Sequence, residues 1–374
     1  MINIAKPYLT VEEAQSAYDT ILSGWVTQGP KVREFEENFA LYTGALYAVA
    51  LSSCTTALHL SMIVSGIKEG CEVICPSMSY IATANSIIHA GGKPVFAEVN
   101  PETYNIDIKS AEKLINPKTK AILIVHQMGL PSDIDAFKSL CEKYNLILIE
   151  DAACAAGAVY KGKKIGSHSD LVCFSFHPRK VITTGDGGMV CTSQESYAER
   201  LRLLRQHGMS VSDSVRHNAK RVIFEEYIEV GYNYRMTDIQ ASIGIKQLKK
   251  LDWLIGERRK IAHKYNEAFR DIDCIRLPSE EKGYFTNYQS YSVYIKKEAP
   301  LTRDELMQKL LDTGIYTRRG IMTVHREPAY REYCKGLKLP LSEDLSDRSI
   351  ILPLYVPMEE KDIDFVISKF REFL

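Results

Sequence analysis

The feature that most constrains this chain is a regular alternation, between about residues 45 and 193, of short apolar runs with longer segments of helical periodicity. Short apolar runs bounded by polar turns are typical of strands buried on both faces, as in a parallel sheet. Such runs begin at Ala45, Glu72, Lys93, Ala121, Leu146, Leu171 and Met189. Right-handed crossovers place the intervening helices over the sheet. We therefore predict an α/β fold with a mostly parallel seven-stranded sheet and helices on both faces.

The pattern changes near Met236, where one long helical segment, or two joined, begins with Thr237 or Asp238 as the candidate N-cap. A strand-like run follows from Tyr288, and further helical segments cover residues 302–311 and 359–373. This mixture predicts a smaller C-terminal α+β domain. We place the large domain at residues 16–249 and the small domain at residues 250–374, with the N-terminal segment 1–15 joining the small domain.

Composition excludes several classes of function. Lys plus Arg and Asp plus Glu both number 47 in 374 residues, so the net charge is zero and no basic stretch is available to bind nucleic acid. The chain begins without a signal-peptide pattern and contains no apolar run of about 18 residues, which predicts no membrane span and a cytoplasmic location. The nine cysteines and nine histidines lack the spacing of a zinc site, so we expect reduced thiols and no metal.

Polar residues follow several of the predicted strands, at the edge where parallel sheets bind ligands. Asp151 ends one apolar run, Lys180 follows another, and Tyr80 follows a third. Cys54 and Thr55 begin a helical segment, whose free backbone N–H groups can hold an anion. Each residue also has a simpler reading: a helix cap, a structural ion pair, a surface lysine or a packed tyrosine.

Together these residues meet the separate needs of one cofactor, pyridoxal 5′-phosphate. Its aldehyde requires a lysine for a Schiff base, its pyridine nitrogen a carboxylate, its phosphate a helix N-terminus, and its ring an aromatic neighbour. The sequence therefore predicts this cofactor, with pyridoxamine 5′-phosphate as the form that carries the amine.

Seven ordered segments carry a family resemblance. They are GWVTQGPKVREFEENFA from Gly24, SSCTTALHL, PSMSYIATANSI, EDAACAAGA, FSFHPRKVITTGDGG from Phe174, QHG and GYNYRMTDIQASIG from Gly231. On these segments the chain resembles the sugar-nucleotide aminotransferases of the DegT/StrS type, which are pyridoxal-phosphate enzymes with the type I, aspartate aminotransferase fold. The resemblance covers nearly the whole chain.

The resemblance implies a role for each matched residue. Lys180 would be the catalytic Schiff-base lysine and Asp151 the partner of the pyridine nitrogen, with Tyr80 stacked on the ring. The remaining cofactor-binding residues would be Cys54, Thr55, Ser175, Cys154 and Asn233. Asn233 would reach the phosphate of the neighbouring subunit, which implies an obligate homodimer. Cys154 stands where the family usually has Gln, so the hydrogen bond made there is altered.

Substrate contacts are implied for Thr27 and Gly29, in a loop that closes over the substrate, and for His325. Because the net charge is zero, we also expect the positive charge that meets the substrate phosphates to be local to the pocket, near Lys180 and either Arg318 or Arg319.

The function implied is transfer of an amino group, from L-glutamate, to a nucleotide-linked keto-deoxysugar, which makes an amino sugar for a cell-surface polysaccharide or a secondary metabolite. Lys180 would act as a neutral amine, so we expect burial beside the cofactor to lower its pKa. Two alternatives stay open: a pyridoxal-phosphate-dependent sugar dehydratase or epimerase, and a non-catalytic regulatory protein of the same fold.

Overall fold

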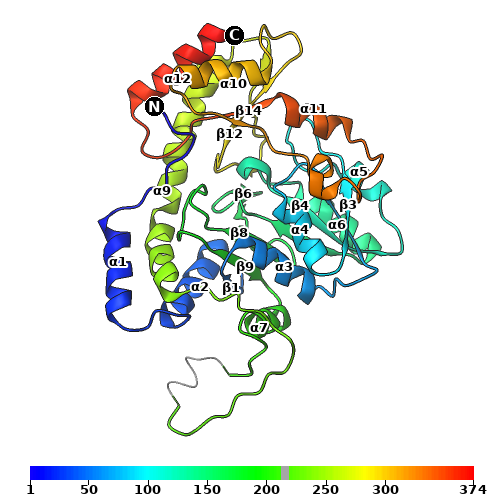
Figure 1. The fold of residues 1–374 in the computed structure, drawn as a ribbon, viewed down its shortest axis with the longest axis vertical. Coiled ribbons are helices and arrows are strands. Elements are labelled where there is room, and N and C mark those ends of the chain that lie inside the picture. The colour runs from blue at the N-terminus through cyan, green and yellow to red at the C-terminus, as the bar shows by residue number, and fades with distance from the viewer. Residues whose placement is uncertain (212–218) are drawn as a thin grey trace.

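All seven predicted strands lie in one central sheet. In the computed structural model, which describes residues 1–211 and 219–374, their order across the sheet is β1-β9-β8-β5-β4-β2-β3 (Figure 1). The strands are β1 (Tyr47–Leu51), β2 (Glu72–Pro76), β3 (Lys93–Ala97), β4 (Thr119–Val125), β5 (Ile147–Asp151), β8 (Leu171–Ser175) and β9 (Gly188–Thr192). The α/β prediction is confirmed.

Most of the pairs in this sheet are parallel, as predicted. Strand β9 is the exception, because it runs antiparallel to both β1 and β8. The antiparallel register sets Ser175 at the end of β8 opposite Gly188 at the start of β9. Strands β5 and β8 run parallel, so Asp151 and Ser175 end at the same edge of the sheet.

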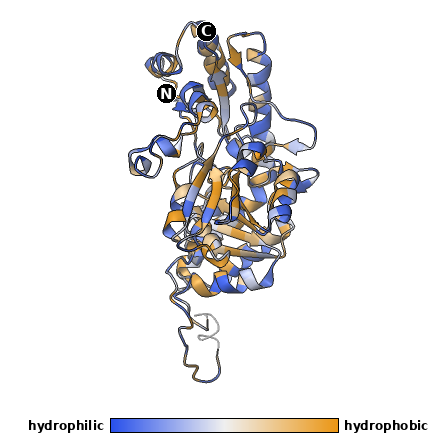
Figure 2. Cartoon of the chain, turned by 90° about the vertical axis from the view of Figure 1, so that its right-hand side faces the viewer, coloured by the Kyte–Doolittle hydropathy of each residue, from blue (hydrophilic) through white to orange (hydrophobic). Residues whose placement is uncertain are grey.

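Helices cover the two faces of the sheet and form two separate apolar cores. One core contains side chains of α2 (Pro30–Thr43), α5 (Ile108–Lys113), α6 (Ile134–Tyr144) and the start of α9. The other contains side chains of α3 (Cys54–Val64), α4 (Ala82–His89) and α7 (Glu195–Leu204). Apolar strands lie between these layers (Figure 2). In the first core the rings of Phe39 and Phe174 meet edge to face, 5.0 Å between centroids.

The long helical pattern after Met236 forms a single helix, α9 (Asp238–Phe269), of 32 residues. Thr237 is its N-cap. The Thr237 hydroxyl accepts from the backbone N–H of Gln240, and the side-chain oxygen of Gln240 accepts from the Thr237 N–H. This capping box confirms the predicted start. The boundary that we place between residues 249 and 250 falls inside this continuous helix.

The C-terminal part contains a second sheet in the order β10-β12-β14-β13. Its elements are β10 (Ile275–Arg276), β12 (Tyr291–Ile295), α10 (Arg303–Asp312), β13 (Arg318–Arg319), α11 (Pro340–Arg348), β14 (Ser349–Leu352) and α12 (Glu360–Phe373). The N-terminus joins this part, because Ile2 donates to the carbonyl of Gly314 at 2.8 Å and is buried in the same apolar core. The division into two domains stays a prediction.

The remaining elements are short or peripheral. Helix α1 (Val11–Leu22) packs on α9, where Glu13 accepts from Gln247 and Lys250. A small sheet joins β6 (Val159–Tyr160), β7 (Lys163–Lys164) and β11 (Tyr284–Phe285). Short 3-10 turns cover Gln127–Gly129, Val324–Arg326 and Pro328–Tyr330. Within the described residues, every helix is too short or too polar to cross a lipid bilayer.

Candidate active site

Asp151 is the last residue of β5 and its carboxylate is buried, with 5% of the residue exposed. One carboxylate oxygen accepts from the Thr83 hydroxyl at 2.8 Å, and the other accepts from the Ala153 N–H at 3.1 Å. Burial raises the pKa of Asp151 above its ordinary value, and these hydrogen bonds only partly oppose the rise. Among the described residues no basic side chain forms an ion pair with it. The carboxylate is therefore suited to receive a cationic N–H donor.

Lys180 lies in the turn after β8, and its Nζ donates to the Sγ of Cys154 at 3.2 Å. Burial alone would lower the pKa of this amine, but Cys154, and next Cys54 and Asp151, favour the charged form and raise the pKa above its ordinary value. In the chain by itself, neighbouring thiols and a carboxylate thus outweigh burial, and the expected lowering of this pKa beside the cofactor stays a prediction. The same interactions show that the structure brings the lysine, the acid and both cysteines together.

The start of α3 forms a second element of the site. Ser53 caps this helix by accepting from the Thr56 N–H, which leaves the first N–H groups, those of Cys54 and Thr55, without an acceptor inside the helix. A Cβ at Gly188 would lie 2.3 Å from the Ser53 carbonyl oxygen, so only glycine lets β9 approach so closely. Since Ser175 is paired with Gly188, its hydroxyl belongs to the same edge. The Ser53 side chain can therefore cap the helix while the N–H groups of Cys54 and Thr55 remain available to bind an anion.

Tyr80 precedes α4 on the same side of the sheet. Its carbonyl accepts from the backbone N–H of Thr83, the residue whose hydroxyl holds Asp151. The Tyr80 side chain is exposed, so a face of its ring is accessible. Its stacking role stays a prediction.

These groups fit pyridoxal phosphate. The buried carboxylate without a cationic partner suits a protonated pyridine nitrogen, and the free helix start beside Ser175 suits a phosphate. Lys180 interacts electrostatically with both Asp151 and Cys54. Grouped His, Cys, Asp or Glu side chains that could hold a metal ion are not found within residues 1–211 and 219–374.

The loop with Thr27 and Gly29 lies elsewhere, at the start of α2. Asp238 holds it: its carboxylate accepts from the Gly29 N–H at 2.7 Å, and its own N–H donates to the Thr27 carbonyl at 3.0 Å. A hollow of about 760 Å³ beside this loop is lined by Trp25 and Asp238, among others, and not by Lys180 or Asp151. Within one chain, the structure does not bring the two loop residues into the Lys180 group.

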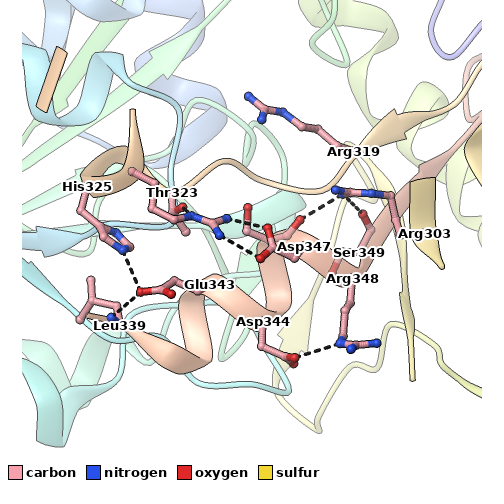
Figure 3. Close-up of polar contacts among 12 residues, drawn as sticks. Arg303, Arg319, Thr323, His325, Leu339, Glu343, Asp344, Asp347, Arg348 and Ser349 are labelled. Atoms are coloured by element: carbon pink, nitrogen blue, oxygen red, sulfur yellow. Dashed lines mark hydrogen bonds and ion pairs between the residues drawn. The ribbon is translucent and has the colours of Figure 1, made fainter. Parts of the chain in front are cut away.

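His325 is buried, with 6% exposed, and both of its ring nitrogens already have partners. Nδ1 lies 2.6 Å from the Ser77 hydroxyl. Nε2 lies 3.1 Å from a carboxylate oxygen of Glu343, a contact drawn in Figure 3. Ser77 is fully buried, so this Ser–His–Glu arrangement is a structural bridge and not a nucleophile site. It ties α11 to the end of β2. The direct substrate contact expected of His325 stays a prediction.

Arg318 and Asn233 are both exposed. Asn233 makes a backbone bridge to Gln206, and no hydrogen bond of its side chain to the Lys180 group is found among the described residues. Its place across a subunit interface stays a prediction, as do the other assigned roles.

Asn287 is a buried residue that the sequence patterns did not point to. Its Nδ2 donates to the carbonyls of Cys154 and Ala156, both at 2.9 Å, and its Oδ1 accepts from the Gln289 N–H at 2.9 Å. It thereby joins the segment with Cys154 to the loop before β12. No motif marks it, because its role arises from contacts between segments 131 or more residues apart.

Comparison with known proteins covers the whole chain. The model of the DegT/DnrJ/EryC1/StrS aminotransferase family matches residues 7–371. The spore coat polysaccharide biosynthesis protein SpsC of Bacillus subtilis is 37% identical over 372 residues, which are 98% of this chain and 96% of SpsC. The aminotransferase TlmJ of Streptoalloteichus hindustanus is 32% identical, with a TM-score of 0.92 over 100% of this chain and 98% of TlmJ.

A third relative has been solved with the cofactor in two states. Spr1654 of Streptococcus pneumoniae is 27% identical in both its PMP form and its PLP form, with TM-scores of 0.94 and 0.92. The matches cover 100% of this chain and 99% and 98% of the two Spr1654 chains. The similarity therefore includes both sequence and fold, from end to end.

Proposed function

The chain belongs to the DegT/DnrJ/EryC1/StrS family of pyridoxal-phosphate-dependent sugar aminotransferases, and from this membership we propose that it transfers an amino group from L-glutamate to a nucleotide-linked keto-deoxysugar. The observation that carries the proposal is the grouping of Lys180, buried Asp151 and the free start of α3 at one edge of the sheet. The amino sugar would serve a cell-surface polysaccharide or a secondary metabolite, and the relationship to SpsC supports the first.

Each catalytic residue has a distinct task in this proposal. Pyridoxal phosphate, when bound, supplies an aldehyde that joins amines and a ring that withdraws electrons. The Nζ of Lys180 would hold the cofactor and, once the substrate amine has displaced it, would carry a proton between the substrate carbon and the cofactor. The Asp151 carboxylate keeps the pyridine nitrogen protonated. For Lys180 to act as a base, its contact with Cys154 must give way, because that contact favours the charged amine.

The other residues bind and orient. We assign the phosphate to the N–H groups of Cys54 and Thr55 and the hydroxyl of Ser175, and the ring face to Tyr80. Cys154 would lie beside the ring, near Lys180. Thr27, Gly29, His325 and Arg318 remain our candidates for shaping the substrate site.

Turnover is the direct test of this function. The purified protein with pyridoxal phosphate and L-glutamate should convert one or more nucleotide-linked 3-keto or 4-keto sugars into a product in which an amino group replaces the carbonyl oxygen, read by mass. Omitting L-glutamate should abolish this product. A dehydrated product formed without L-glutamate would point to the dehydratase reaction instead, and a protein that stays colourless with pyridoxal phosphate would contradict catalysis altogether.

We also propose a homodimer. Residues 219–230 extend away from the body below α7 (Figure 1) and expose large apolar side chains, including Phe224 at 88% and Val230 at 90%. Exposed apolar side chains gathered on one segment favour a protein partner. Asn233 follows this segment directly, so a second copy bound there would bring Asn233 close to the partner's cofactor phosphate.

The double variant Phe224→Ser/Val230→Ser tests this interface. Light scattering during gel filtration should give a dimer mass for the wild type and a monomer mass for the variant, because two apolar contacts are lost from each copy. The variant should also bind pyridoxal phosphate more weakly. Phe365→Ser, on α12 in the C-terminal part, is the control and should stay dimeric. A wild-type monomer, or a variant that remains a dimer, would contradict the proposal.

We place the reaction in the cytoplasm. All nine cysteines are free. Unpaired thiols suit the interior of the cell, where they are kept reduced.

A further inference from the structure

Two arginines beside the Lys180 group have no acidic partner among the described residues. Arg179 directly precedes Lys180, and Arg318 lies on β13. Both residues line one small hollow together with Gln289 and Ser290, and the charge of Arg179 is close enough to repel that of Arg318. Two guanidinium groups that face the same space repel each other unless an anion lies between them. An anion bound in the hollow would relieve this repulsion.

The size and walls of the hollow indicate which anion fits. Its volume is about 60 Å³. A carboxylate fits that space. The lining also includes the apolar residues Ile351 and Leu354, which suit the methylene carbons of a small acid. A carboxylate can also accept paired hydrogen bonds from each planar guanidinium.

The polar wall is held in place by the backbone. The Gln289 side-chain amide donates to the Arg179 carbonyl at 2.9 Å. Arg258, from α9, donates to the carbonyl of Gln289 at 2.6 Å and to that of Tyr288 at 2.9 Å. Arg318 is fixed by its pairing with Ile351 across β13 and β14. The two arginines thus project from segments that are anchored to the rest of the fold.

We propose that Arg179 and Arg318 bind a carboxylate of the amino donor, which is a dicarboxylic amino acid, and this rests on the proposed aminotransferase function. In an amino acid the carbon that carries the amine also carries a carboxylate, so an amine that reacts at Lys180 brings an acid group within a few bonds. In a nucleotide sugar the sugar ring separates the diphosphate from the reacting carbon. Once the donor has given up its amine, the same two arginines would bind the carboxylate of the resulting keto acid until it leaves.

Arg319 offers a matched control. It follows Arg318 on β13, so its side chain points to the other face of the strand. It is 58% exposed at the side chain and lies 3.6 Å from a carboxylate oxygen of Glu327. Figure 3 shows it extending away from the contacts of α11. Arg319→Gln removes a charge next to the proposed site without touching the hollow.

The test compares donor and acceptor binding in Arg179→Gln, Arg318→Gln and Arg319→Gln. The first two variants should raise the L-glutamate concentration that half-saturates the colour change of the pyridoxal-phosphate-loaded protein by at least roughly tenfold. They should weaken binding of maleate, an unreactive dicarboxylate, by a similar factor in calorimetry. Their affinity for whichever of dTDP, UDP and GDP the wild type binds should stay within about twofold. Arg319→Gln should behave as the wild type in all three measurements.

Either of two results would overturn the assignment. L-glutamate and maleate could bind both variants as well as they bind the wild type, or the variants could lose nucleotide affinity while maleate binding persists. A wild type whose colour does not respond to L-glutamate would instead contradict the proposed donor, and the maleate titration would still report on the two arginines.

Discussion

Lys180→Ala is expected to lower turnover of L-glutamate and a nucleotide-linked keto sugar by at least about a thousandfold, because it removes both the covalent anchor of the cofactor and the group that moves the proton. The measurement is the rate of aminated product at saturating pyridoxal phosphate. Since Lys180 Nζ contacts the Cys154 thiol and forms no ion pair with an acid in the described part of the chain, alanine should leave the fold intact.

Two controls separate this effect from damage elsewhere. Lys138→Ala changes an exposed lysine of α6 and should retain wild-type turnover. Borohydride treatment of the wild type should fix the cofactor mass on the peptide with Lys180, and the corresponding peptide of the variant should gain nothing. Full turnover by Lys180→Ala would refute its assignment.

Asp151→Asn is expected to bind pyridoxal phosphate and yet lose roughly a hundredfold to a thousandfold in rate. The amide keeps the size of the carboxylate and can still meet Thr83, but it cannot hold a proton on the pyridine nitrogen. Asp273→Asn, at an exposed acid, is the control and should not change the rate. An unchanged rate for Asp151→Asn would refute its role as the nitrogen partner.

Stability gives an independent measure of Asp151. Its pKa is raised in the folded chain, so its ionised form is less stable there than in the unfolded chain. This penalty is absent below the unfolded pKa, grows as pH rises from there towards the folded pKa, and is therefore present at neutral pH. Without cofactor at pH 7, Asp151→Asn should therefore melt at the same temperature as the wild type or higher. Added pyridoxal phosphate should raise the Tm of the wild type more than it raises the Tm of Asp151→Asn.

The large sheet could be predicted because its strands are buried on both faces and therefore appear as uninterrupted apolar runs. The start of α9 could be predicted because the Thr237 and Gln240 capping box is local in sequence. The antiparallel placement of β9 could not, since it depends on pairing with β1, some 140 residues earlier. Strands of two residues, such as β13, have no periodicity to detect.

The candidate site, too, could be predicted only where a local sequence pattern marks its residues. Asp151, Lys180, Cys54 and Ser175 come together because strand ends share one edge, and that rule can be applied to a sequence. Asn287 and the Arg179 and Arg318 hollow depend on how separate segments pack. The raised pKa of Lys180 likewise arises from Cys154 and Cys54, whose distances to the amine are fixed only by the fold.

Helix α9 has a mechanical consequence. At 1.5 Å per residue its 32 residues span roughly 48 Å, and nothing within it interrupts its hydrogen-bond ladder. A continuous helix of this length is stiff. Its interior is therefore not a hinge between the sheet that carries Lys180 and the C-terminal strands that carry Arg318. Any change in the spacing between these two parts is therefore expected in the loops around the helix and not within it.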